Sequence, residues 1–581
     1  MLTRTKIVCT LGPACNSKEK ISALLDAGMN VARLNFSHGT YEEHAAVIAR
    51  LKAAREEKGL PLAIMLDTKG PEIRLGKLKG GELTLKEGDK IWLVRETVEG
   101  SAEQISLTPS FALDTLEKDM FVLLDNGYII THVVAIDQRG VQVIVDNGGS
   151  IRSTRGVNIP GVDVALPALT AKDIDDIRFG CEQDVDLVAA SFVRSPEHVL
   201  EIKKLLESCC KPDIAVIAKI ENRMGVQNFD RISDVADGIM VARGDLGVEM
   251  PLTQVLRLQK MMIRKCHRNG KPSVTATQML ESMIMSPRPT RAEASDVANA
   301  IYDSTSAVML SGETAVGNYP VEAVKMMRAI VEESENDFDY DDFLQHAPRL
   351  YQDVPSAVAL ASIKTAYSAG AKAIFACSTS GQTARYLSRL RPQMPIIVLT
   401  STKKVYHQLS VVWGVIPLYC EEVHSIEGAF KKLSTFALEG GYVKYGDLVV
   451  ITGGTPFGRA GTTNMMFVDS IGDILVRGTE GKGKQVDGKV TLELEAEEYT
   501  VRGKILVLSE CSETTLPYLK HASGIVLDRT ADNASIDYLK EMAAILELPY
   551  ILHATNALEI LREGQLITLD PEHALVYKGI L

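Results

Sequence analysis

Three charged side chains stand where two apolar runs of the sequence end. Lys219 and Glu221 follow the run Asp213 to Ala218, and Asp245 follows the run Gly238 to Ala242. Two buried strands would therefore deliver an ammonium group and two carboxylates to one edge of a sheet. Charges are costly to bury unless something opposes them, so this grouping favours a bound metal ion and an anionic substrate. Such a combination is typical of chemistry on phosphate esters.

A second polar cluster lies within the segment Ala32 to Gly39, where an apolar strand ends. Arg33 could fork onto a phosphate, and oxygens of Asn35 and Ser37 could bind a cation. The same residues could instead begin a helix, with Ser37 as its cap and Arg33 in a salt bridge. The residue types alone leave both interpretations open.

Other strand ends carry polar groups as well. Asp67 could cap a helix, but Gly70 and Pro71 break the chain directly after it, so we expect no helix there. The glycines of Arg243 to Gly247 would let backbone amides approach an anion. Threonine is common in strands, so the structural interpretation of Thr277 is the default. Only its position at a strand end suggests a role in the active site.

The elements that must position these residues are short apolar runs, each followed by a turn and a helix-like segment. They are Lys6 to Thr10, Val31 to Asn35, Leu62 to Asp67, Leu187 to Ser191, Ile214 to Lys219, Ile239 to Arg243, Ser273 to Thr277 and Val308 to Ser311. Eight such units close most simply into a (β/α)8 TIM barrel, with its active site at the carboxyl-terminal strand ends.

The remaining sequence predicts three further parts of an α/β protein. Short strands with Gly-rich turns interrupt the barrel and predict a small inserted β-barrel lid. Strand and helix alternation after the barrel predicts an open α/β domain, then a Gly- and Lys-rich linker, then a small α/β unit. The predicted ranges are 1–70 and 168–345 for the barrel, 71–167 for the lid, 346–476 for the open domain, 477–489 for the linker and 490–581 for the last unit.

Composition excludes several classes of protein. The 581 residues are 46% hydrophobic and 24% charged, with a net charge of -12, and no basic run resembles a nucleic-acid footprint. The longest apolar stretches are strand-sized, so no membrane span is expected. Nine scattered cysteines and no signal peptide before Thr5 favour free thiols and a cytoplasmic location.

At this point the chain closely resembles the bacterial form of the pyruvate kinase family, over essentially its whole length. The motifs that carry the resemblance are TKIVCTLGPA at Thr5, NVARLNFSHG at Asn30, LDTKGPEIR at Leu66, IAKIEN at Ile217, VARGDLGVE at Val241, KPSVTATQMLESM at Lys271, RPTRAEASDVANA at Arg288 and AVMLSGETA at Ala307. The resemblance implies transfer of phosphate from phosphoenolpyruvate to ADP, giving pyruvate and ATP.

The same resemblance implies roles for the barrel residues. Glu221 and Asp245 would hold Mg2+ (or Mn2+), and Lys219 and Arg33 would face the phosphoryl group in transfer. The amides of Gly244 and Asp245, with the Thr277 hydroxyl, would bind the substrate carboxylate. Thr277 or a nearby water would lie on the route that protonates the enolate.

Further family sites follow by similarity. A K+ site would use Asn35, Ser37, Asp67 and Thr68, with Glu72 as the residue that marks potassium dependence. The nucleotide side would include Asn35, His38, Arg74 and Lys172. One departure lies in the lid, where Asp125-Asn126-Gly127 replaces the usual Asp-Asp-Gly, so a charge is missing at Asn126.

The open α/β domain carries a hydroxyl-rich turn that could cradle a phosphate or could be an ordinary capped turn. Its residues are Ser378, Thr379, Ser380, Gly381, Gln382 and Thr383. The resemblance favours a phosphorylated allosteric effector there, a sugar phosphate or AMP, and a homotetramer. The last unit resembles the mobile domain of phosphoenolpyruvate-utilising enzymes without its histidine, since Tyr538 stands near that place.

Two other classes of function fit part of the pattern. A metal-dependent aldolase or lyase acting on pyruvate enolate would share Glu221, Asp245 and an arginine, but it would not need a lid or nucleotide residues. A regulator without activity would have lost key groups, yet Lys219 and Thr277 are present. A purely structural role is the weakest interpretation.

Overall fold

The computed structural model describes residues 3–162, 164–345, 353–423, 425–456, 458, 461–493 and 500–580. The predicted domain limit at 346 lies outside these residues, as do the chain ends Met1 and Leu581. The chain divides into two compact units, one of residues 1–360, 376–424 and 453–464, the other of residues 361–375, 425–452 and 465–581.

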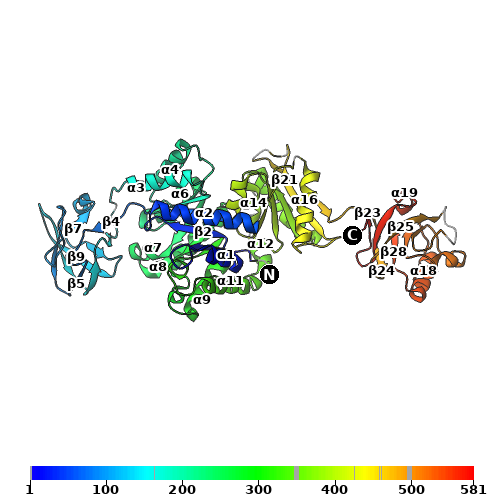
Figure 1. Ribbon diagram of the computed structural model, residues 1–581, viewed down its shortest axis with the longest axis horizontal. Helices are drawn as coiled ribbons and strands as arrows, with labels where there is room; N and C mark the ends of the chain where they lie inside the picture. Colours follow the sequence, from blue (N-terminus) through cyan, green and yellow to red (C-terminus); the bar gives the residue numbers. More distant parts are fainter. Residues whose placement is uncertain are drawn as a thin grey trace. The chain divides into compact units, whose positions relative to one another are not determined.

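Eight parallel strands close into a barrel in the first unit, which confirms the predicted fold (Figure 1). They are β1 (Lys6–Thr10), β2 (Val31–Asn35), β3 (Ala63–Asp67), β13 (Leu187–Ala190), β14 (Ala215–Ile220), β15 (Gly238–Ala242), β16 (Ser273–Ala276) and β17 (Ala307–Leu310). Nearly every residue in them is buried, because helices cover the outer face and side chains fill the interior. Each strand lies within one residue of its predicted limits.

Helices alternate with these strands, and several begin at a side-chain cap. The Thr170 hydroxyl, for example, accepts a hydrogen bond from the Asp173 amide, and the Asp173 carboxylate accepts one from the Thr170 amide. The helices are α1 (Lys18–Ala27), α2 (Tyr41–Lys58), α3 (Ala171–Glu182), α4 (Pro196–Ser208), α5 (Arg223–Gln227), α6 (Phe229–Val235), α7 (Arg243–Glu249), α8 (Leu252–Arg268), α9 (Arg291–Tyr302), α10 (Gly312–Ala315) and α11 (Pro320–Asn336).

Strand register sets which polar residues meet at the end of the barrel. In the β2–β3 pair Asn35 stands opposite Asp67, and in the β14–β15 pair Ile220 stands opposite Val241. Residues that follow these strands therefore reach the same rim. No helix begins directly after Asp67, as the Gly70-Pro71 break predicted.

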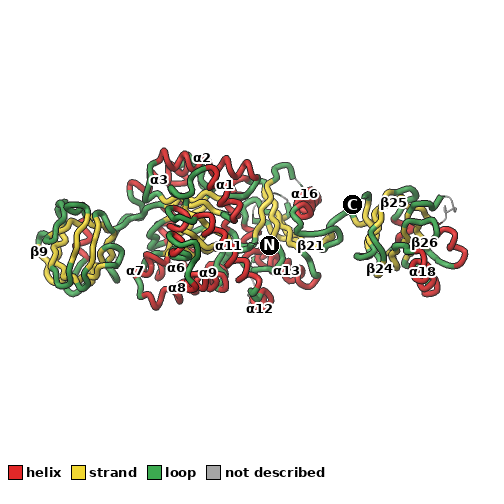
Figure 2. The backbone as a smooth tube through the Cα atoms, turned by 60° about the horizontal axis from the view of Figure 1, so that its bottom comes forward, coloured by secondary structure: helices red, strands yellow, loops and turns green. Residues whose placement is uncertain are grey.

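The inserted module is a second closed barrel, as predicted, and Figure 2 shows it built of strands and loops with little helix. Its strands are β4 (Ile73–Leu75), β6 (Lys90–Val94), β7 (Gln104–Thr108), β8 (Phe121–Leu124), β9 (Ile129–Asp137), β10 (Gly140–Val145) and β12 (Gly156–Asn158), with β5 (Glu82–Leu85) and β11 (Gly149–Arg152) as a separate pair. Alternate residues of these strands form its apolar core.

A five-stranded sheet in the order β20-β19-β18-β21-β22 follows. Its strands are β18 (Ala373–Cys377), β19 (Ile396–Thr400), β20 (Val415–Tyr419), β21 (Leu448–Gly454) and β22 (Thr463–Ser470), and its helices include α13 (Val354–Ala369), α14 (Gln382–Ser388), α15 (Lys403–Gln408) and α16 (Ile426–Glu439). The apolar runs of the sequence predict the first four of these strands, at Lys372 to Cys377, Pro395 to Thr400, Val415 to Cys420 and Leu448 to Thr452. They do not predict β22, in which the apolar run Met465 to Val468 is short and half of the residues are exposed.

The terminal part forms an eight-stranded sheet that begins earlier than predicted. Its elements are β23 (Ile474–Arg477), β24 (Glu480–Lys482), β25 (Val486–Leu492), β26 (Ile505–Leu508), β27 (Gly524–Asp528), β28 (Tyr550–Ala554), β29 (Leu566–Asp570) and β30 (Leu575–Lys578), with helices α17 (Leu516–Leu519), α18 (Asn533–Leu546) and α19 (Ala557–Ile560). Tyr538 lies on α18.

The prediction of a linker at 477–489 was therefore wrong. Strand β24 pairs with β28, and β25 lies between β29 and β26. A Cβ on Gly481 would come within 2.3 Å of the Pro571 carbonyl oxygen, and one on Gly488 would lie 3.1 Å from Ile505. The glycines thus allow close packing of strands, and their abundance did not indicate a flexible segment.

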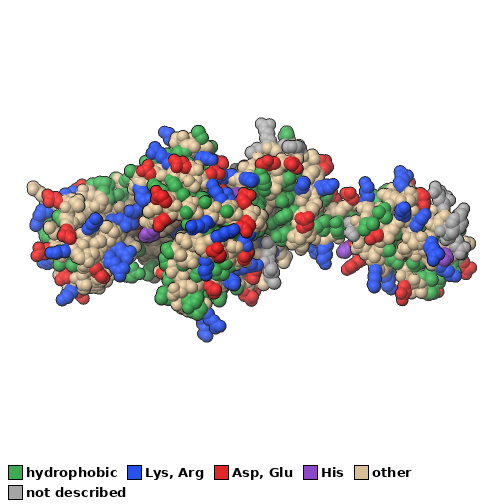
Figure 3. All heavy atoms as spheres, in the orientation of Figure 1, with side chains coloured by type: hydrophobic (Ala, Val, Ile, Leu, Met, Phe, Trp, Pro, Cys, Tyr) green, Lys and Arg blue, Asp and Glu red, His purple; other side chains and the backbone are tan. Residues whose placement is uncertain are grey.

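The surface carries charges of both signs, interspersed on the face drawn in Figure 3. Within the described ranges, no helix has the length and apolar character needed to cross a membrane. All nine cysteines are free thiols.

Candidate active site

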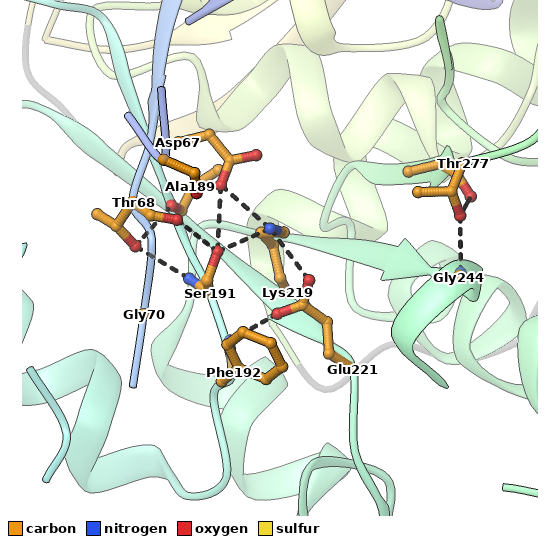
Figure 4. Close-up of polar contacts among 12 residues, drawn as sticks. Asp67, Thr68, Gly70, Ala189, Ser191, Phe192, Lys219, Glu221, Gly244 and Thr277 are labelled. Carbon is orange, nitrogen blue, oxygen red and sulfur yellow. Dashed lines mark hydrogen bonds and ion pairs between the residues drawn. The ribbon is translucent and has the colours of Figure 1, made fainter. Parts of the chain in front are cut away.

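Asp67 is the centre of a buried ionic cluster at the carboxyl end of the barrel strands (Figure 4). Its Oδ2 accepts a hydrogen bond from Arg33 Nε at 2.5 Å, and its Oδ1 accepts from Lys219 Nζ at 3.1 Å and from Ser191 Oγ at 3.2 Å. Burial alone would raise the pKa of Asp67, but the charges of Arg33 and Lys219 outweigh it and lower that pKa. Asp67 is therefore a carboxylate that organises two cations.

The ammonium group of Lys219 lies among three oxygen atoms. Besides Asp67, it contacts Ser191 Oγ at 2.7 Å and Glu221 Oε1 at 3.0 Å. Burial acts to lower the pKa of Lys219, yet the neighbouring carboxylates of Asp67 and Glu221 raise it. The group stays charged and is fixed in place for an anionic substrate.

Glu221 is almost completely buried, and its second carboxylate oxygen accepts a hydrogen bond from the Phe192 amide at 2.6 Å. Burial raises the pKa of Glu221 to about 7, although Lys219 opposes the shift and Asp245 adds to it. Burial also raises the pKa of Asp245. Two carboxylates that are costly to ionise side by side favour a cation between them.

Within the described part of the chain, no three His, Cys, Asp or Glu residues form a ready cage for a metal ion. This fits Mg2+, which proteins usually hold through one or two carboxylates while substrate phosphates and water complete the shell. Glu221 and Asp245 supply oxygens of the required type. The donor set thus agrees with a divalent ion that binds together with its substrate.

Thr277 has a left-handed backbone conformation with φ of 67°, which is rare for a β-branched residue. Its Oγ1 accepts a hydrogen bond from the Gly244 amide at 2.8 Å (Figure 4). Arg243 donates to the carbonyl oxygens of Ala276 at 3.2 Å and Thr277 at 2.8 Å, and its other side forms an ion pair with Asp296 at 2.7 Å. One guanidinium group therefore holds both carbonyl groups of the strained turn at Thr277.

The predicted K+ ligands lie at one rim, though several are already engaged. Thr68 Oγ1 accepts from the Ser191 amide at 3.1 Å, and Asn35 Oδ1 accepts from the Ser37 amide at 3.1 Å. Asn35 stands beside Asp67 through the β2–β3 register. The structure thus brings Asn35, Asp67 and Thr68 together as neighbours.

The predicted nucleotide residues make separate contacts. Arg74, on lid strand β4, donates to Glu72 at 2.6 Å, and Lys172, on α3, pairs with Asp176 at 2.7 Å. His38 is exposed at the end of the segment after β2. Neither Arg74 nor Lys172 has its cation directed at Asp67 or Glu221.

Sequence reasoning missed Ser191 and Phe192. Ser191 bonds to Asp67 and Lys219, and the Phe192 amide, in a left-handed residue with φ of 54°, holds Glu221. Its position in the sequence could have identified Ser191. It ends a predicted barrel strand, as Asp67 does, and a polar residue at the end of a barrel strand is a candidate site residue.

A cavity of about 270 Å³ lies between the lid and the barrel rim. Glu72, Asn126, Asp245 and Glu249 are among its lining residues, and Asn158 of the lid donates to Glu249 at 2.9 Å. Burial raises the pKa of Glu249. The candidate metal ligand Asp245 therefore borders a space in which a substrate could lie.

The predicted effector turn borders a second cavity, of about 350 Å³. Ser378, Thr379, Ser380, Gln382 and Thr383 line it together with the glycines that follow β21. Gly381 has φ of 75° and forms the cap of α14. Thr383 and Thr463 share a hydrogen bond of 2.6 Å. The turn is thus both a helix start and the wall of a polar cavity.

Three family models match the chain. They are described as "Pyruvate kinase, barrel domain" over residues 2–324, "Pyruvate kinase, alpha/beta domain" over residues 356–468, and "PEP-utilising enzyme, mobile domain" over residues 500–574. Apart from the linker at 477–489 and the start of the last unit, the predicted domain limits are not tested and stay predictions.

Curated relatives match over the full length. The proteins named pyruvate kinase from Geobacillus stearothermophilus, Staphylococcus saprophyticus and Bacillus licheniformis are 44%, 43% and 43% identical to this chain. Each alignment covers 100% of this chain and 99% of the relative.

Proposed function

Because the chain belongs to the pyruvate kinase family of phosphotransferases, which act on phosphoenolpyruvate and ADP, we propose that the buried cluster around Lys219 is its catalytic site. The observation that supports this most strongly is the Lys219 ammonium group, held among Asp67, Ser191 and Glu221 at the barrel rim. Phosphoryl transfer needs a positioned cation where charge spreads over the equatorial oxygens, and Lys219 supplies one.

In the transfer, the bond from phosphorus to the enol oxygen breaks and a bond from phosphorus to a β-phosphate oxygen of ADP forms. Lys219 donates to the phosphoryl oxygens, and Arg33, held by Asp67, adds a second cation. The amides of Gly244 and Asp245 and the Thr277 hydroxyl bind the substrate carboxylate. The enolate then takes a proton at carbon on the side of Thr277, which gives pyruvate.

The family uses a divalent metal and potassium, and we assign their positions in this chain. Glu221 and Asp245 hold Mg2+ or Mn2+, which when bound neutralises charge on substrate oxygens. Asn35, Ser37, Asp67 and Thr68 hold K+, and Glu72 makes the enzyme depend on it. Arg74, Lys172 and His38 lie on the nucleotide side, with Arg74 supplied by the lid.

We extend the proposal to regulation and assembly. The hydroxyl-rich turn 378–383 and its cavity take the phosphate of a sugar phosphate or of AMP, which activates the enzyme. The chain assembles as a homotetramer in the cytoplasm. The terminal domain has a structural or regulatory role, since Tyr538 stands near the place where the mobile domain of related enzymes carries a histidine.

The test is pyruvate formation from phosphoenolpyruvate and ADP with Mg2+, in K+ and in Na+, each with and without sugar phosphates or AMP. Stimulation of ADP-dependent turnover by K+ over Na+ is expected, and an effector should lower the KM for phosphoenolpyruvate. Equal rates in K+ and Na+ would contradict the role of Glu72. Pyruvate release that does not require ADP would instead support a lyase.

A further inference from the structure

Cationic side chains gather in a hollow between the end of α8 and the segment that follows α14, away from the catalytic cluster. Lys271, Arg385, Arg389 and Arg391 line it, together with His267 and Ser306, and its lining includes no Asp or Glu. The hollow is therefore lined by positive charges alone, whereas the protein surface carries charges of both signs.

Arg391 is the most constrained member of this set. It is 2% exposed, its backbone is left-handed with φ of 46°, and its guanidinium group lies 4.5 Å from the ring centre of Trp413. Its terminal nitrogens donate to the carbonyl oxygens of Ser388 at 3.1 Å and Ser304 at 2.7 Å. Its Nε has no partner among the described residues.

His267 adds a neutral polar atom to the hollow. Burial and the nearby arginines lower its pKa to about 3, so the ring is uncharged at neutral pH. Its Nδ1 also lacks a partner within the described part of the chain. In one tautomer that atom carries an N–H, which is a second donor without a partner in a residue that lines the hollow.

The nearest acidic groups are engaged elsewhere. Glu335 accepts the amides of Arg4 and Thr5, and Asp237 accepts Lys203 Nζ at 3.1 Å. Among the described residues, neither Arg391 nor Lys271 forms an ion pair. Arginine cannot lose its proton inside a protein, so its buried charge requires an anion or strong hydrogen bonds.

We propose that this hollow is a binding site for a small inorganic anion of halide size, with chloride as the natural occupant. The cavity measures about 10 Å³, which admits one water-sized particle. A halide is a single atom that accepts hydrogen bonds from all sides, so it can use the unpartnered Nε of Arg391 and Nδ1 of His267. Lys271 and Arg385 add positive charge, while their side chains donate to the carbonyl oxygens of Ala236 at 2.7 Å and Ser380 at 3.2 Å. A phosphate ester would need these side chains to move apart.

The position of Trp413 provides a direct readout of binding. Bromide or iodide bound beside Arg391 would quench the fluorescence of that ring, which is 4% exposed and therefore poorly accessible to collisions from bulk solution. The sequence contains only two tryptophans, and Trp92 lies in the lid beside Arg139. The full chain with Trp92→Phe isolates the signal of Trp413.

The experiment titrates potassium bromide against potassium gluconate at constant K+ concentration and ionic strength. Saturable quenching of Trp413 is expected, with chloride competing for the site. Lys271→Gln and Arg385→Gln, each in the Trp92→Phe chain, should weaken the apparent bromide affinity at least tenfold. Lys265→Gln, which removes a surface cation from α8 that pairs with Asp230, is the matched control and should leave the affinity unchanged.

Linear, unsaturable quenching that is the same in all four proteins would overturn the proposal, because it would report collisions only. Saturation by inorganic phosphate without any response to halides would also overturn it, since the occupant would then be larger than the hollow allows. If one variant fails to fold, the titration of the Trp92→Phe chain and the remaining variant still decide between these outcomes.

Discussion

At the scale of single residues, the proposed catalytic cluster consists of buried side chains whose opposite charges offset one another. Lys219 faces Asp67 and Glu221, Arg33 faces Asp67, and Asp245 adds the charge that a metal would offset. Asp67 and Lys219 keep their charges in a buried place because partners of opposite sign are fixed beside them, whereas burial raises the pKa values of Glu221 and Asp245. Removal of one member should therefore disturb the remaining ones.

Lys219→Met should lower kcat by about 10²–10³-fold, since a buried donor to the transferring phosphoryl group is lost. The KM for phosphoenolpyruvate should change much less, because Arg33 and the carboxylate-binding groups remain. Steady-state kinetics measures both, with Lys265→Met on the surface of α8 as control. Near-normal turnover would remove Lys219 from its assigned role.

Arg243→Lys should lower kcat about tenfold or more, although Arg243 is assigned no contact with substrate. A lysine cannot hold two carbonyl groups and Asp296 at once, so the strain of Thr277, worth roughly 1–3 kcal/mol, would relax and displace its hydroxyl. Comparison of kcat and KM with those of the exposed-site variant Arg264→Lys measures the effect. Unchanged kcat would show that Thr277 needs no such support.

At the scale of elements, the loops after the barrel strands carry the chemistry, and close backbone packing fixes them. Gly70, between β3 and the lid, has φ of 75°, and its amide donates to Asp173 at 2.9 Å. A Cβ there would lie 2.8 Å from Ser191 Cβ and 2.9 Å from Phe192 Cδ2. The chain segment that leads into the lid thus presses on the residues that hold Lys219 and Glu221.

Gly70→Ala should consequently reduce kcat strongly by displacing Ser191 and Phe192. Gly59→Ala is the matched control, because Gly59 has φ of 61° but a Cβ there would have no atom within 4 Å. Both variants carry the left-handed strain of roughly 1–2 kcal/mol, and only Gly70→Ala adds the collision. Thermal unfolding and kinetics together separate the two effects, and equal loss of activity in both variants would refute the argument.

At the scale of the whole molecule, the terminal sheet begins at β23, so the position of a truncation matters. A chain ending at residue 472 should keep phosphoryl transfer and remain monodisperse. A chain ending at residue 489 would keep β23 and most of β25 without β30, β29 and β26, and unpaired strand edges favour aggregation. Light scattering and the pyruvate assay test both chains. Loss of turnover in a folded chain of 472 residues would give the terminal domain a catalytic role.

The barrel and residues 376–424 share a buried histidine that links stability to pH. His407 is 4% exposed, its Nδ1 accepts from the Leu62 amide at 3.4 Å, and burial with the nearby charges of Arg55, Lys404 and Lys403 lowers its pKa to about 3. The folded pKa lies below the ordinary value of 6.5, so the stabilisation is complete above pH 6.5 and is lost as the pH falls toward 3.

His407→Gln should flatten the fall of Tm between pH 6.5 and 5, to which His407 contributes up to about 1.4 kcal/mol per pH unit. Glutamine can still accept the Leu62 amide but gains no charge in acid. Scanning calorimetry at several pH values compares the two proteins, whose carboxylates contribute the same slope to each. Parallel curves would mean that His407 does not titrate with unfolding.

The sequence by itself determined the eight barrel strands and the rim that carries Lys219, Glu221 and Asp245. Burial on both faces leaves continuous apolar runs in a parallel sheet, and all its strands end at one edge, so local pattern contains both facts. The sequence motifs that resemble pyruvate kinases also indicated the family to which the chain belongs.

Only the tertiary structure decided which groups meet. Lys219 contacts Asp67 across 152 residues of sequence, Arg243 supports Thr277 from the preceding strand end, and β24 pairs with β28 although its glycines suggested a linker. The hollow around Arg391 likewise gathers residues from distant segments. Residue periodicity records which face of an element is buried, whereas partners are chosen when the closed barrel and the packed sheets bring separate segments together.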